Sequence, residues 1–101
     1  DNSVGPQDSR LRSLLGRFPK IVYLCGHLHL SFGVTGPVTV KSKEGGSFTE
    51  ITLPSFQNAK RAYRDLPATW LMYVYEDRLV LRARNFRTGE WMTEYDAVIT
   101  F

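Results

Sequence analysis

The stretch KIVYLCGHLHLSFG, residues 20–33, decides how this sequence is interpreted. Residues 21–24 form a continuous apolar run, which predicts a strand that is covered on both faces and parallel to a neighbour. Gly26 follows, and a glycine there lets the backbone turn sharply. Both histidines of the chain, His27 and His29, come directly after it. We therefore expect the two imidazoles at the carboxyl edge of a sheet, where ligand sites of open α/β sheets lie.

The residues before this strand predict an amphipathic helix. Asp8 or Ser9 is a suitable N-cap, and Pro19 ends the helical pattern. Apolar side chains recur at the spacing that lines one helix face, at Leu11, Leu14, Leu15 and Phe18. Residues 1–7 have the polar, Gly-Pro composition of a linker. A helix followed by a buried strand indicates an α/β arrangement in segment 8–33.

The remaining segment, residues 34–101, has the pattern of antiparallel β-structure. Runs over 38–43 and 48–53, joined by a Glu-Gly-Gly-Ser turn, predict a hairpin. One turn of helix is expected near residues 58–63. The fold class expected for the isolated chain is therefore α+β, in a single unit of 101 residues.

The tail predicts a meander of three strands. Residues 70–75 are apolar at both parities, so we expect a central strand there. Residues 78–84 alternate apolar residues with arginines, which predicts one solvated face. Residues 91–101 predict the last strand, with the odd-numbered residues on one side.

The composition limits the class of protein. With 43% apolar and 13% aromatic residues the chain can bury a core, and its formal net charge is only +3. The single cysteine excludes an internal disulfide framework. No stretch approaches the about 20 apolar residues of a membrane span, so we expect no membrane partner. The cellular compartment is left open by these features.

The histidine pair has alternative interpretations. An arbitrary His-x-His pair is most often two hydrogen-bonded loop residues. Cys25 has the same parity as His27 and His29, so a zinc site of one thiolate and two imidazoles is a second alternative.

The context of the pair resembles the last motif of the calcineurin-like metallophosphoesterases. The motif is an apolar strand followed by Gly26-His27-Leu28-His29. The amphipathic helix upstream and ITLPSF at residues 51–56 also match the order of that family. The family's Asp-x-His, Gly-Asp and Gly-Asn-His motifs and its separate middle histidine are missing. The resemblance therefore implies that this chain is the C-terminal portion of an αββα sandwich.

The resemblance also implies a function for the parent protein, the metal-dependent hydrolysis of phosphate mono- or diesters. His27 would bind the second and His29 the first of two divalent ions, such as manganese, iron or zinc. Ser55 and Asn58 would lie at the rim of the site and contact the phosphate ester. The general acid is expected in the missing half, so we assign no catalytic residue here. The isolated chain is expected to be inactive and metal-free.

Two further expectations concern partners. The missing N-terminal half is the expected partner, and exposed edge strands would favour a homodimer. The competing hypothesis is a non-catalytic β-rich binding or interaction module. Arg78, Arg82 and Arg84 near aromatic residues leave nucleic acid open as a substrate, although a solvated sheet face explains the same pattern.

Overall fold

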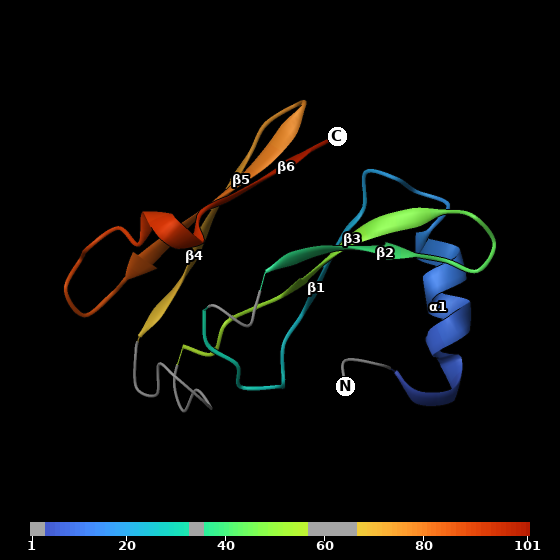
Figure 1. The fold of residues 1–101 in the computed structure, drawn as a ribbon, viewed down its shortest axis with the longest axis horizontal. Helices are drawn as coiled ribbons and strands as arrows, with labels where there is room; N and C mark the ends of the chain where they lie inside the picture. The colour runs from blue at the N-terminus through green and yellow to red at the C-terminus, as the bar shows by residue number, and fades with distance from the viewer. Residues whose placement is uncertain (1–3, 33–35, 57–66) are drawn as a thin grey trace.

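The computed structural model describes residues 4–32, 36–56 and 67–101. The elements in chain order are η1 (Gly5–Gln7), α1 (Asp8–Leu15), β1 (Val22–Cys25), β2 (Pro37–Lys41), β3 (Ser47–Thr52), β4 (Ala68–Val74), β5 (Arg78–Asn85), η2 (Thr93–Tyr95) and β6 (Ala97–Thr100). The strands form a first sheet of order β1-β3-β2 and a second sheet of order β4-β5-β6 (Figure 1). The fold is therefore a small α+β fold, and the αββα sandwich stays a prediction. The helix expected near residues 58–63 falls outside the described residues.

The first sheet contains both kinds of pairing that the sequence predicts. β1 pairs with β3 in parallel, and β2 pairs with β3 in the antiparallel sense. Coverage of β1 on both faces is wrong, because β1 is the edge strand of this sheet and Leu24 is 44% exposed.

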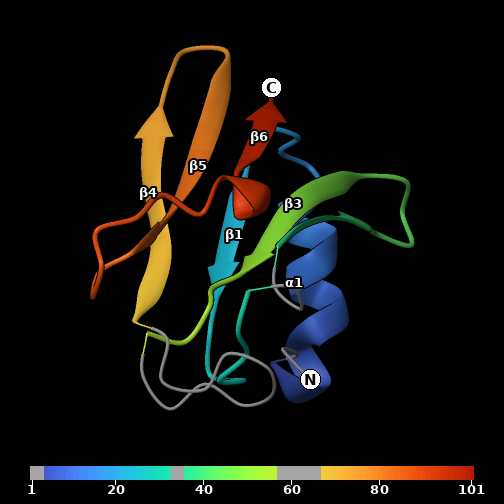
Figure 2. The same ribbon diagram turned by 60° about the vertical axis from the view of Figure 1, so that its left-hand side comes forward.

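The helix and both sheets form three layers, with α1 beside the first sheet on the side away from the second sheet (Figures 1 and 2). The predicted N-cap is wrong. The short helix η1 continues directly into α1, so Gln7 is the N-cap and Asp8 lies in the first turn. The linker predicted over residues 1–7 therefore contains helical structure in η1, at residues 5–7. The helix ends at Leu15, which leaves Phe18 beyond it and half-exposed.

The second sheet is the predicted meander with a different central strand. β5 lies between β4 and β6, so the expectation that β4 is central is wrong. The predicted solvated face of β5 is confirmed, since Leu79, Leu81 and Ala83 are buried and the residues between them are not.

The last predicted strand is shorter than expected. Of residues 91–101, β6 forms a strand and Trp91 forms an isolated antiparallel bridge with Arg84, because η2 interrupts the segment between them. Two hydrogen bonds hold this turn: the Ala83 amide donates to Asp96 Oδ1 at 2.8 Å, and Trp70 Nε1 donates to the Tyr95 carbonyl at 2.8 Å. The Ala83 amide of β5 therefore finds its acceptor in a side chain of the turn, where a continuous strand would offer a backbone carbonyl.

The main core lies between the two sheets. Ile51 from β3 packs with Leu79 and Leu81 from β5, and Ile51 and Leu81 are 0% and 1% exposed. A second cluster forms around Phe32, which stacks on Tyr95 at 5.0 Å and meets Trp70 edge-on at 4.9 Å. The chain that follows β1 is thereby anchored between the sheets. Among the described residues, no helix is both long and apolar enough to span a membrane.

Candidate functional site

The candidate site is the loop between β1 and Phe32, which contains both histidines. Backbone hydrogen bonds hold it to the segment after β3: the Leu53 amide donates to the Cys25 carbonyl at 2.7 Å, and the Ser55 amide donates to the Leu30 carbonyl at 2.7 Å. Phe32 is buried in the core at the far end of the loop. The loop is therefore fixed on both sides of the histidines.

The backbone at both histidines is left-handed, with φ of 77° at His27 and 53° at His29. This conformation is uncommon for residues other than glycine, although histidine adopts it more often than most. Gly26 does not adopt a positive φ, and a side chain there would meet nothing within 4 Å. The expectation that the glycine makes the sharp turn is therefore wrong. The turn is made at the histidines, and both of them are exposed to solvent.

The other residues predicted for this site differ in where they lie relative to the histidines. Ser55 lies beside the histidine loop through its backbone bond to Leu30. Asn58 falls outside the described residues. Cys25 directs its Sγ toward β3, where the Ile51 carbonyl and Thr52 Oγ1 each lie at 3.5 Å.

This loop offers a metal ion two ligands, the imidazoles of His27 and His29. Neutral imidazole nitrogen is a common ligand of zinc, iron and other divalent ions. Within residues 4–32, 36–56 and 67–101 no three His, Cys, Asp or Glu side chains group together as a metal site. The alternative zinc site of Cys25, His27 and His29 therefore has no support in this part of the chain. Further ligands would have to come from outside this part of the chain.

The aromatic rings nearest to the arginines of β5 are partly covered by those arginines. Arg82 and Arg84 both lie over Trp91, at 4.0 and 4.6 Å from the ring centre, and Arg78 lies over Tyr75 at 4.4 Å. At both rings a guanidinium already lies over the aromatic surface on which a base could stack. The structure therefore favours the interpretation of this surface as a solvated sheet face.

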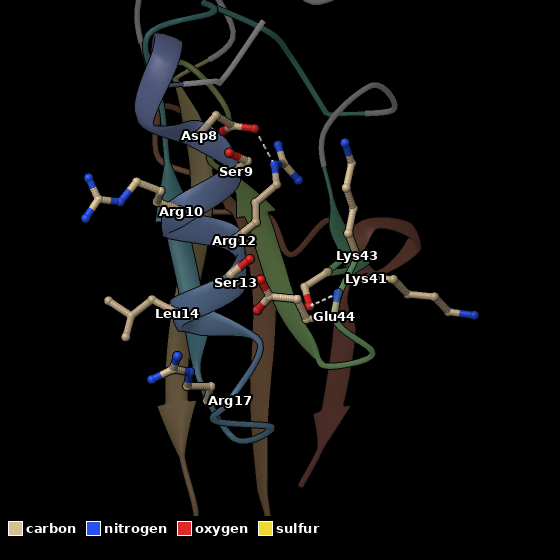
Figure 3. A pocket seen from close by; sticks show the side chains of 11 residues that line it. Asp8, Ser9, Arg10, Arg12, Ser13, Leu14, Arg17, Lys41, Lys43 and Glu44 are labelled. Carbon is tan, nitrogen blue, oxygen red and sulfur yellow. Dashed lines mark hydrogen bonds and ion pairs between the residues drawn. The ribbon is translucent and has the colours of Figure 1, made fainter.

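A second hollow, absent from the sequence predictions, lies between α1 and the turn that joins β2 to β3 (Figure 3). Its volume is about 670 Å³, and Figure 3 shows Arg12 directed from the helix toward the hairpin, whereas Arg10 and Arg17 extend from the opposite side of the helix. The helical spacing indicated only that Arg10, Arg12 and Arg17 point outward. No local signal in the sequence brings Lys41 and Lys43 to the lining of the same hollow.

No protein-family model, curated protein or solved structure matches this chain.

Proposed function

We propose that this chain is the metal-binding C-terminal part of a metallophosphoesterase that hydrolyses phosphate mono- or diesters. The observation that carries the proposal is the pair of exposed, left-handed histidines directly after a parallel strand. Backbone strain at residues other than glycine costs of order 1–3 kcal/mol each and is concentrated at active sites and ligand-binding loops. His27 and His29 are therefore the residues to which we assign a function.

In this proposal each imidazole binds one of two divalent ions. Such ions, when bound, polarise a phosphoryl oxygen and activate water. The chain itself supplies ligand orientation. Because Phe32 and the Leu53 and Ser55 amides fix the loop, the imidazoles have little backbone freedom to lose when a metal binds. Ser55 stands beside the loop, where it would contact the ester.

A second observation supports a larger catalytic unit. Leu24 pairs with Ile51 in a parallel register, so both side chains lie on the side of the first sheet that faces the second sheet. Met72 and Val74 share the parity of Trp70, which packs in the core, yet they are 40% and 71% exposed. The layer between the sheets is thus open where these side chains lie.

A further strand at the β1 edge would cover this open layer. We assign that strand to the expected N-terminal half, which would also carry the remaining metal ligands. A second copy of the chain paired through the same edge, which is the predicted homodimer, would cover the layer in its place. In the competing hypothesis, a non-catalytic interaction module, this apolar layer is the binding surface and the histidines have no role.

The test uses the complete open reading frame that encodes this chain. Manganese-dependent hydrolysis of bis(p-nitrophenyl) phosphate and bound metal per protein are measured for wild type, His27→Ala, His29→Ala and the control Val98→Ala, an exposed position on β6. We expect both histidine variants to lose activity and bound metal, and the control to keep both. Wild-type protein that is inert with manganese, iron and zinc, or unchanged rates in the histidine variants, would favour the interaction module.

A further inference from the structure

We propose that the face of the second sheet that is turned away from the first sheet binds an acidic partner protein, through an apolar contact and two arginines beside it. The proposal is independent of the phosphoesterase function and of the histidine loop. The surface that carries it, here called the outer patch, consists of Leu71, Tyr73, Val80, Arg82, Arg84 and Trp91.

The alternation of β5 determines which side chains form the outer patch. Every second residue of this strand is buried against the first sheet, so the residues between them point away from it. Residues paired across antiparallel strands point to the same side, which places Tyr73 beside Val80 and Leu71 beside Arg82. Since α1 lies on the far side of the first sheet (Figures 1 and 2), the α-helix of the described chain does not cover this face.

The apolar part of the outer patch is accessible to a partner. Tyr73 and Trp91 are each 37% exposed, and Leu71 and Val80 are half-buried. An antiparallel sheet with one face in solvent commonly has polar residues on that face. Here Leu71, Tyr73 and Val80 are neighbours on it instead. Covering these three side chains removes apolar surface from water, which favours association.

The charge of the outer patch favours carboxylates on the partner. Arg84 forms no ion pair with any residue in the described part of the chain. Arg82 has only a long contact, 4.0 Å from Nε to Asp96 Oδ2, and the other oxygen of that carboxylate accepts a backbone amide. By contrast, Arg78 is neutralised by Asp77 at 2.9 Å. The positive charge therefore lies at Arg82 and Arg84, beside the apolar part, and complementary charge on the partner steers association.

Trp91 holds both guanidinium groups in position. Their central carbons lie 4.0 and 4.6 Å from the centre of its ring. A side chain that is already ordered loses less freedom on binding, and a guanidinium over a ring still donates N–H groups to a carboxylate in a bidentate manner. Trp, Tyr and Arg are enriched at the residues that dominate binding energy, whereas Lys, Asp and Glu are depleted in interfaces. The outward positions of β4 and β5, all of them described, contain no Lys, Asp or Glu.

The probe is a phage-displayed library of a small helical domain with randomised surface positions, selected on the product of the complete open reading frame. Clones that bind Tyr73→Thr as well as wild type are removed; threonine deletes the ring and keeps a residue that strands favour. We expect the remaining clones to be enriched in Asp and Glu. Their binding, measured by interferometry, should weaken about tenfold or more in Arg82→Gln/Arg84→Gln, because hydrogen bonds between charged groups are lost. The control Arg10→Gln/Arg17→Gln removes the same charge from α1 (Figure 3) and should change the affinity less than about twofold.

Several outcomes would overturn the proposal. They are the loss of every clone at the Tyr73→Thr step, remaining clones without excess Asp and Glu, and equal affinities for the two double arginine variants. A single-stranded oligonucleotide that bound more tightly than the clones and depended on Arg82 and Arg84 would assign the outer patch to nucleic acid instead. Dimerisation that Tyr73→Thr abolished would assign it to a second copy of the chain. His27→Ala/His29→Ala should leave clone binding unchanged, so failure of the phosphoesterase proposal would not affect this result.

Discussion

The contact between the end of α1 and the hairpin turn gives the sharpest test of the fold. A Cβ added at Gly46 would overlap the Gly16 carbonyl oxygen and lie 2.6 Å from its carbonyl carbon. Both partners are backbone, so neither can rotate away. The turn is also fixed internally, since the Ser42 amide donates to the Gly46 carbonyl at 2.7 Å. Gly46→Ala must therefore separate the helix from the hairpin.

The expected loss follows from this overlap. Overpacking by one methyl group usually costs about 1–3 kcal/mol, and in a domain of this size each kcal/mol lowers the Tm by about 4–8 °C. Gly26→Ala is the matched control, because nothing lies within 4 Å of its added Cβ and its φ is not positive. Differential scanning fluorimetry and urea unfolding measure both variants. Equal Tm values for Gly46→Ala and wild type would mean that α1 does not rest on this turn, and the two sides of the hollow between them would not be fixed.

Three further variants test other parts of the structure. Leu81→Ala should lower the free energy of unfolding by about 2–5 kcal/mol, measured in urea, whereas Val98→Ala, at a position 61% exposed, should leave it nearly unchanged. Asp96→Ala should cost about 1–3 kcal/mol by leaving the buried Ala83 amide without its acceptor, and Asp96→Asn, which retains an oxygen acceptor, should cost less. His27→Gly should be more stable than His27→Ala by about 1 kcal/mol, because only glycine adopts the left-handed backbone without strain, while both variants should lose metal binding.

The sequence predicts well those elements in which the pattern of polar and apolar residues matches the burial of each side chain. The alternation in β5 is visible because every second residue faces the core. Chain order alone does not determine which strands pair. β4 is apolar at both parities, yet it lies at a sheet edge, where its Met72 and Val74 are 40% and 71% exposed. The position of a strand within a sheet depends on partners that are distant in sequence.

The two sites differ in the same way. His27 and His29 are visible in the sequence because they belong to one loop. The hollow between α1 and the β2–β3 turn is not visible in the sequence, because its two sides become adjacent only when the close contact of Gly16 and Gly46 brings the helix to the hairpin. Local patterns identify sites made by one segment and miss sites made by packing.

The backbone of the histidine loop gives a physical reason to assign it a function. A loop that only connects two elements is most stable with glycine at left-handed positions. This chain has a glycine at residue 26, where φ is not positive, and histidines at 27 and 29, where it is. The buried Phe32 and the two amide hydrogen bonds hold this arrangement against its strain. Since stability favours glycine at both positions, the imidazoles themselves are the feature that remains to be explained, and the metal binding that we propose would explain it.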